Sequence, residues 1–147
     1  MGATVELSAR GLTVTAGETL IGADLDMSQV GELVPTITAI AVAASSITTI
    51  RGVAHLRGHE TDRISALAAE FSRLGGSVEE TEDGLRINPQ PLKPGVFHSY
   101  ADHRMATAGA LVGLRVPGIQ VENIGTTDKT MPEFTRRWHD MLGDAAA

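Results

Sequence analysis

Two separate stretches of the chain match each other in register. Residues 2–14 read GATVELSARGLTV and residues 76–87 read GSVEETEDGLRI, so each contains Val-Glu, then a turn, then Gly-Leu. Three pairs of apolar residues share one separation of 73 positions: Val5 and Val78, Leu12 and Leu85, and Val14 and Ile87. A separation shared by three pairs indicates an internal duplication, and we expect a duplicated chain to fold into two similar halves.

Each of these hairpin-like stretches is followed by the same series of segments. A helix rich in small residues comes first, then a short β-branched strand, a charged loop, and an amphipathic helix that ends in Leu-Gly. These segments span residues 28–45, 47–50, 57–63 and 64–76 in the first half, and 103–114, 119–124, 126–133 and 134–144 in the second. Further strand material lies around residues 19–25 and 91–97. The sequence therefore predicts an α/β fold in which ββ-α-β-α occurs twice, over about residues 1–75 and 76–147, with no flexible linker between the halves.

The two amphipathic helices are the clearest predictions. Helical spacing places apolar residues on one stripe of each helix: Ile64, Leu67, Ala68, Phe71 and Leu74 in the first, and Phe134, Trp138 and Met141 in the second. Gly75 and Gly143 stand where the end of a helix favours glycine. We expect Trp138 to pack into the core.

Composition limits the kinds of partner. A net charge of −6 and 3% aromatic residues argue against a surface for nucleic acid, and the charge also argues against anionic membranes. The chain has no cysteine, which excludes thiolate chemistry, and His55, His98 and His139 show no metal-ligand spacing. The longest apolar stretch is too short to span a bilayer, and no signal peptide opens the chain. We expect a cytoplasmic protein with no metal or cofactor.

Charged clusters stand at the start of three predicted helices. They read HETDR, YADHR and TTDKT, and the segment before the first of them adds Arg57. Each has a candidate helix cap: Thr61, Asp102, and a capping box from Thr130 to Glu133. The pattern predicts that each cluster lies at a helix N-terminus, where unpaired N–H groups carry a partial positive charge.

These helix N-termini are candidates for one anion site. If they converge, Arg63, Arg104 and Lys129 would surround a multiply charged anion. Taken one by one, the same clusters also fit solvated helix caps with weak surface pairs, and spacing alone does not choose between the two interpretations.

The strings HETDR, YADHRMA and TTDKTMPEF, in this order and at these intervals, resemble the C-terminal part of the 5-enolpyruvylshikimate-3-phosphate synthase family. The resemblance runs from MGATVE to WHDML but covers only about a third of a typical member. Members have two similar domains, each an inside-out α/β barrel of βαβαββ units around a pseudo-threefold axis. The resemblance implies that residues 1–147 form about two units of the C-terminal domain, that Met1 is internal to a longer chain, and that the missing N-terminal part is a partner.

The same resemblance implies a reaction. The family moves the enolpyruvyl group of phosphoenolpyruvate to the 5-hydroxyl of shikimate 3-phosphate and releases phosphate, which requires a proton donor, a base and cations. By position, the implied catalytic residues are Glu60 in proton transfer at the methylene carbon, Glu32 as the base, and His103 beside phosphoenolpyruvate. The residues implied to hold phosphoenolpyruvate are Arg63, Arg104 and Lys129. Those implied for shikimate 3-phosphate are Glu32, His55 and His59.

Two of these positions depart from the usual family pattern. Glu32 stands where an aspartate is common, and it reaches one methylene further. His59 stands where a lysine is usual, and a histidine changes its charge near neutral pH. We therefore expect the charge at position 59 to depend on pH.

Two other functions remain open at this point. The sibling enolpyruvyl transferase that acts on UDP-N-acetylglucosamine shares fold and donor, although ETDR and DHRMA favour the shikimate enzyme. A non-catalytic domain that binds anions or RNA is disfavoured by the net charge and the few aromatic residues. We expect the isolated chain to be inactive, because a lone part of the enzyme cannot exclude water from the reacting groups.

Overall fold

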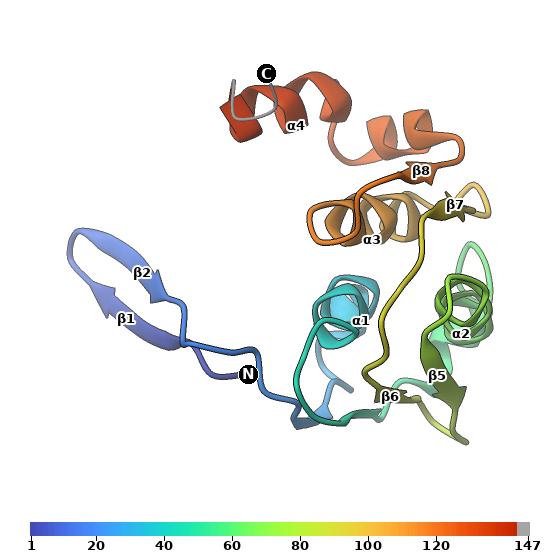
Figure 1. Ribbon diagram of the computed structural model, residues 1–147, viewed down its shortest axis with the longest axis horizontal. Coiled ribbons are helices and arrows are strands. Elements are labelled where there is room, and N and C mark those ends of the chain that lie inside the picture. Colours follow the sequence, from blue (N-terminus) through green and yellow to red (C-terminus); the bar gives the residue numbers. More distant parts are fainter. Residues whose placement is uncertain (144–147) are drawn as a thin grey trace.

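The computed structural model describes residues 1–143, and its elements follow the predicted order (Figure 1). The first half contains β1 (Thr4–Ser8), β2 (Gly11–Thr15), β3 (Asp24–Asp26), α1 (Val34–Ala41), β4 (Thr48–Arg51) and α2 (Arg63–Arg73). The second half contains β5 (Ser77–Glu80), β6 (Leu85–Asn88), β7 (Gly95–Phe97), α3 (His103–Gly113), β8 (Ile119–Val121) and α4 (Phe134–Leu142). Three short 3-10 helices are η1 (Gly31–Leu33), η2 (Ala54–Gly58) and η3 (Ile124–Lys129).

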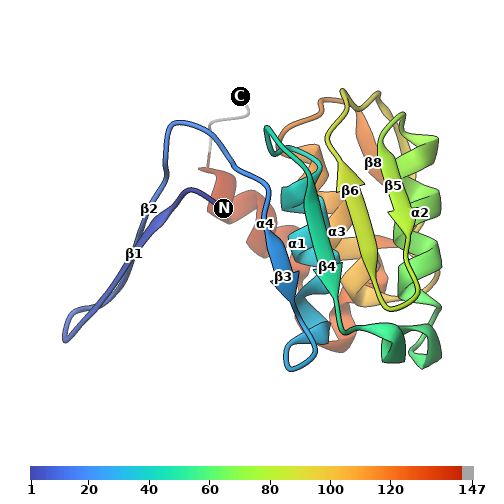
Figure 2. The same ribbon diagram turned by 90° about the horizontal axis from the view of Figure 1, so that it is seen from below.

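The strands of the described part of the chain form three separate sheets. The largest has the order β3-β4-β6-β5, in which β3 and β4 are parallel, and β6 is antiparallel to both of its neighbours, β4 and β5 (Figure 2). It therefore joins strands from both sides of residue 75, and the division of the chain into repeats at that residue stays a prediction. The other sheets are the parallel pair β7–β8 and the hairpin β1–β2.

The core lies between the four-stranded sheet and α1, α2 and α3. Figure 2 shows these helices behind one face of the sheet. The predicted stripe of α2 is buried, with Ile64, Leu67 and Phe71 fully covered, and Phe71 contacts the ring of Phe97 edge-on at 5.5 Å. Gly109 lets α3 lie close to Phe97 of β7, because a Cβ at position 109 would come within 2.8 Å of the Phe97 ring. Side chains on the other sheet face are polar and partly or fully exposed, as the alternation along β4, β5 and β6 shows.

Two helix starts differ from the predictions. Asp62, not Thr61, caps α2, because its carboxylate accepts the Ser65 N–H at 3.0 Å and the helix begins at the next residue, Arg63. The predicted capping box from Thr130 to Glu133 does not form. Glu133 occupies the cap position of α4 with φ 60° and no side-chain cap.

Two other predictions overestimated the length of a helix and the burial of a helix face. The helix expected over residues 28–45 is only α1, since Pro35 sits in its first turn and cannot continue a helix backward. The prediction that Trp138 packs into the core was wrong. Phe134 is buried, whereas Trp138 is half-buried against that ring and Met141 is exposed, because no described element covers this face of α4.

The hairpin β1–β2 extends away from the rest of the molecule in both views (Figures 1 and 2). Its apolar residues Val5, Leu7, Leu12 and Val14 are exposed. Among residues 1–143, no helix combines the length and apolar character needed to cross a bilayer.

Candidate active site

The three charged clusters converge in space. Glu60, which precedes α2, lies within hydrogen-bond distance of His103 at the start of α3, with 3.1 Å between Oε2 and Nδ1. Its other oxygen pairs with Lys129 at the end of η3. Arg63, at the first position of α2, reaches Asp102 just before α3. These pairs bridge 39 to 69 positions of sequence, so the fold brings together groups that the chain order separates.

Arg63 and Asp102 form the buried part of this cluster. Arg63 is 2% exposed and Asp102 is fully buried, and two hydrogen bonds of 2.7 and 3.3 Å join the guanidinium to the carboxylate. Asp102 also caps α3 by accepting the backbone N–H groups of Arg104 and Met105, which confirms it as the predicted cap. Burial opposes the charge of Arg63, but hydrogen bonds to Asp102 and Glu32 outweigh it, so the pKa of Arg63 is raised.

Glu32 lies where three basic side chains meet. It accepts a hydrogen bond of 3.0 Å from Arg63 and lies 3.3 Å from both the His59 ring and Arg104 Nε. Burial alone would raise the pKa of Glu32, but the hydrogen bond from Arg63 and the positive charges around it lower the pKa below its usual value. Glu32 is therefore ionised at neutral pH, the state that a general base requires.

Glu60 is the second carboxylate of the cluster. The hydrogen bond from Lys129 is the largest influence on it and lowers its pKa, partial burial opposes this, and His103 lowers the pKa further. Glu60 is therefore ionised at neutral pH. Any process that removes Lys129 would raise the pKa of Glu60.

The cations differ in how free they are to bind something else. Arg63 directs its N–H groups to Asp102, Glu32 and His59, all within 3.3 Å. By contrast, the side chains of Arg104 and Lys129 are 34% and 62% exposed, although Arg104 Nε itself is buried and makes no hydrogen bond to any described residue. Arg104 and Lys129 are therefore the groups that an incoming anion could reach.

The remaining predicted residue also lies at the cluster. His55 is on η2, and its ring centre is 5.8 Å from that of His59. The structure thus brings together every residue predicted for the site: Glu32, His55, His59, Glu60, Arg63, His103, Arg104 and Lys129. Their individual roles stay predictions.

The segment that carries Asp102 is held by a residue that the sequence analysis did not identify. Tyr100 and Ala101 have φ values of 55° and 56°, in the left-handed region, directly before the cap. Buried Glu70 accepts hydrogen bonds of 2.8 Å from the Tyr100 hydroxyl and from the His98 N–H. The detectable signal was a glutamate within the apolar stripe of α2, a position that needs buried partners.

Glu60, Asp102 and His103 could be considered as metal ligands. Their donor atoms lie within 4.8 Å of one another. However, Asp102 already faces Arg63 and Glu60 already faces Lys129, so a metal ion would have to displace or repel these cations. The basic side chains of the protein already balance the charge of these carboxylates, so the residues do not fit a resident metal ion.

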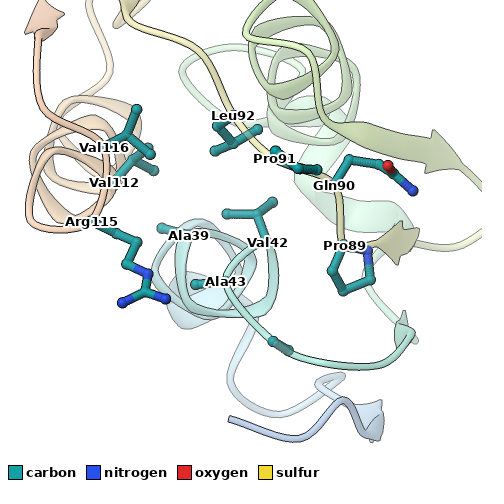
Figure 3. Close-up of a pocket in the computed structure, with 11 residues that line it drawn as sticks. Ala39, Val42, Ala43, Pro89, Gln90, Pro91, Leu92, Val112, Arg115 and Val116 are labelled. Carbon is teal, nitrogen blue, oxygen red and sulfur yellow. The ribbon is translucent and has the colours of Figure 1, made fainter. Parts of the chain in front are cut away.

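A different hollow lies at the opposite ends of the helices. It encloses about 370 Å³ between the C-terminal ends of α1 and α3 and the segment after β6 (Figure 3). Apolar side chains such as Val42, Leu92 and Val116 line it, and Arg115 is its charged member. It shares no residue with the charged cluster, so it is not a continuation of that site.

A comparison with known protein families decides the affiliation of the chain. The sequence profile of EPSP synthase (3-phosphoshikimate 1-carboxyvinyltransferase) matches residues 1–138. The chain belongs to this family. The resemblance found in the motifs is thereby confirmed.

Individual relatives agree with this affiliation. The chain is 57% identical over 142 residues to the 3-phosphoshikimate 1-carboxyvinyltransferase of Kocuria rhizophila, which covers 97% of this chain and 32% of that protein. Among solved structures, EPSP synthase from Acinetobacter baumannii superposes with a TM-score of 0.79 at 26% identity, over 97% of this chain and 37% of that one. The chain thus spans about a third of these relatives.

A third similarity concerns the fold alone. The enolpyruvyl transferase NikO from Streptomyces tendae matches with a TM-score of 0.69 at 20% identity, over 92% of this chain and 31% of that one. Together the structural matches confirm the predicted fold class, a mixed α/β arrangement that corresponds to part of the enolpyruvyl transferase fold.

Proposed function

We propose that this chain is the part of an EPSP synthase that binds phosphoenolpyruvate and handles its protons. The whole enzyme would transfer the enolpyruvyl group to the 5-hydroxyl of shikimate 3-phosphate and release phosphate. The observation that supports this most directly is the single cluster in which Arg104 and Lys129 are reachable cations beside the carboxylates Glu32 and Glu60. Phosphoenolpyruvate carries a carboxylate and a phosphate, which match two such cations.

The proposed chemistry uses one carboxylate as an acid and the other as a base. Glu60 gives a proton to the methylene carbon of phosphoenolpyruvate, which leaves positive charge on the neighbouring carbon. Glu32 takes the proton of the 5-hydroxyl as its oxygen bonds to that carbon. Because the product keeps the double bond, Glu60, ionised after the first transfer, takes one proton back from the new methyl group as the bond between the carbon and the phosphate oxygen breaks. The proton on Glu32 leaves with the released phosphate. Arg104 and Lys129 balance the negative charge of the carboxylate and of the departing phosphate.

Anion binding would also change the acidity of Glu60. In the structure Lys129 pairs with Glu60 and lowers its pKa. When Lys129 turns to the substrate phosphate, Glu60 loses the largest cause of that lowering, and its pKa rises toward a value suited to a proton donor. Glu32 keeps the hydrogen bond from buried Arg63 and therefore stays ionised as a base. The substrate would thus separate the two pKa values, as acid–base catalysis requires.

Binding of phosphoenolpyruvate to the chain tests the proposal. We expect addition of phosphoenolpyruvate to shift backbone amide NMR signals of residues 59–63, 102–105 and 126–130. Arg104→Gln and Lys129→Met should each weaken binding by about tenfold or more, since hydrogen bonds to charged groups contribute about 1.5–3 kcal/mol. The matched control is Arg136→Gln, whose guanidinium is exposed on α4 and pairs with Glu133 and Asp140. Equal loss of affinity in all three variants, or in none, would contradict the proposal.

Catalysis itself is a separate measurement. We expect no phosphate release from the two substrates by the isolated chain, because the other parts of the enzyme are needed to close the site. Turnover by the chain alone would show that the site is complete without them. The binding result does not depend on that outcome.

A further inference from the structure

The loop that carries Glu60 has little packing of its own. Residues 59–62 connect η2 to α2 without regular structure. The side chains of His59 and Glu60 are 30% and 29% exposed, and a Cβ added at Gly58 would meet no atom within 4 Å. A loop of this kind samples many conformations unless other groups hold its ends, because fixing the backbone of each residue costs entropy.

Arg57 connects the two ends of this loop. It lies on η2, just before the loop, and its Nη1 donates a hydrogen bond of 3.2 Å to Asp62 Oδ2 at the far end. The other oxygen of Asp62, Oδ1, accepts the Ser65 N–H and caps α2. The Asp62 carboxylate therefore binds Arg57 and the start of α2 at the same time. His59 and Glu60 lie between the two residues that are joined in this way.

The hairpin β5–β6 holds Arg57 from outside the loop. Nη1 of Arg57 also donates to Glu80 Oε2 at 2.6 Å, and Nη2 donates to the Thr81 carbonyl at 3.3 Å. The side chains of Arg57 and Glu80 are 34% and 39% exposed, so both are partly shielded from water. Glu80 and Thr81 contact no residue of the candidate active site through these bonds, and their connection to it runs through Arg57.

The same hairpin also holds the chain before η2. Asp83 accepts the Gly52 N–H at 2.8 Å with its side chain and the Val53 N–H at 2.7 Å with its carbonyl oxygen. In Figure 2 the turn between β5 and β6 lies beside the segment that joins β4 to α2. Residues 80–83 thus form a support to which the chain is attached on both sides of Leu56, at residues 52–53 and at Arg57.

We propose that Arg57 is a positioning residue for Glu60. By holding both ends of the loop, Arg57 keeps the Glu60 carboxylate beside Lys129 and His103. A planar guanidinium suits this role, because its N–H groups point in fixed directions and bind several oxygens at once. The hydrogen bonds of Arg57 within residues 1–143 do not include Glu60, so Arg57 acts through the loop backbone. This role rests on the function proposed above, in which Glu60 transfers the proton.

A carboxyl NMR titration of Glu60 in the variant Glu80→Ala tests the proposal. Removal of the negative charge of Glu80 would by itself lower the pKa of nearby carboxyl groups. Loss of the support for Arg57 has the opposite effect, because a looser loop lets Glu60 leave Lys129 and His103, which lower its pKa. We expect the pKa of Glu60 to rise in this variant. An unchanged or lower pKa would overturn the proposal.

The matched control is Glu79→Ala. Glu79 is the neighbouring residue of β5, is exposed, and points to the opposite face of the sheet, away from Arg57. The substitution removes the same charge without removing a partner of Arg57, so the pKa of Glu60 should not rise. A rise equal to that in Glu80→Ala would show that the effect does not depend on the bond to Arg57 and would refute the proposal.

The variant Arg57→Gln completes the test. It should raise the pKa of Glu60, and the double variant Arg57→Gln with Glu80→Ala should raise it no further, because both changes break the same connection. Additive rises would overturn the proposal. A role in stability alone would lower the urea midpoint and leave the titration of Glu60 unchanged, and circular dichroism checks that each variant is folded.

The titration needs no substrate. It therefore decides the role of Arg57 separately from the proposed function. Failure of the unmodified chain to bind phosphoenolpyruvate would contradict the proposed function, whereas a Glu60 titration that does not respond to Glu80→Ala would contradict the role of Arg57.

Discussion

Replacement of Asp102 by alanine should severely destabilise the protein. The substitution leaves Arg63, 2% exposed, without the carboxylate that binds it through two hydrogen bonds. Breaking a buried ion pair by removal of one partner costs about 3–5 kcal/mol. Loss of the cap on the Arg104 and Met105 N–H groups adds about 1 kcal/mol. The expected decrease in the free energy of unfolding is about 4–6 kcal/mol, a large part of the 5–15 kcal/mol typical of a domain.

Asp62 offers a matched control within the same chain. It also caps a helix, accepts a backbone N–H at 3.0 Å, and pairs with an arginine, Arg57, at 3.2 Å. The difference is exposure, since the Asp62 side chain is 38% exposed and Asp102 is fully buried. Asp62→Ala should therefore cost only the cap and a weak surface pair, about 1–2 kcal/mol.

Urea unfolding followed by far-ultraviolet circular dichroism measures both changes. We expect Asp102→Ala to lower the transition midpoint far more than Asp62→Ala. The dependence of the free energy of unfolding on urea concentration should be similar in the two variants. The double variant Arg63→Met with Asp102→Leu should recover part of the loss, because it removes the isolated buried charge. Equal costs for the two alanine variants would refute the reasoning that burial makes this pair important. A double variant as unstable as the sum of the single changes would point to packing instead.

Three further predictions concern the groups around this pair. Lys129→Met should raise the pKa of Glu60, which a carboxyl NMR titration measures, and an unchanged titration would be evidence against the pairing. The lowered pKa of Glu60 stabilises the fold above the unfolded-state pKa, and this contribution is lost as the pH falls through the folded-state pKa. The variant lacks that contribution, so it should lose less stability than the unmodified chain on acidification. In a full-length enzyme, His59→Lys should alter the acid limb of the pH–rate profile, and superimposable profiles would contradict a pH-dependent charge at this position. Glu70→Leu should cost about 1–3 kcal/mol in urea unfolding, because the Tyr100 hydroxyl loses its buried acceptor, and a cost near zero would show that the carboxylate does not secure this turn.

The order of elements could be predicted because the same series of sequence patterns occurs in both halves of the chain. The apolar stripe of α2 and the 73-residue match between the hairpins each depend on local spacing, and the structure has the helix and both hairpins where these patterns place them. The burial of Trp138 could not be predicted in the same way. Helical periodicity identifies an apolar face, but whether another element covers that face depends on tertiary structure.

The site shows the same boundary between local and tertiary information. Asp102 could be identified as a cap from its position before a helical pattern, and the capping hydrogen bonds confirm it. Its bond to buried Arg63 could not be identified, because 39 residues separate the two and each looked like an ordinary charged residue at a helix start. The pairing of Lys129 with Glu60 across 69 positions could not be predicted from sequence spacing either. This pairing is the largest cause of the lowered pKa of Glu60.

The placement of these pairs would let the cluster be stable before an anion arrives and still bind one, as proposed above. Three cations held close together repel one another unless negative charges lie between them, and Asp102, Glu32 and Glu60 supply three such charges. Because only the Arg63–Asp102 pair is fully out of water, it holds α2 against α3, while the outer pairs break at lower cost. In the proposed reaction an anion therefore exchanges with carboxylates that are already at the surface, and the buried pair need not move. Affinity is reduced by the pairs that must break, but the released carboxylates are the ones that the reaction uses.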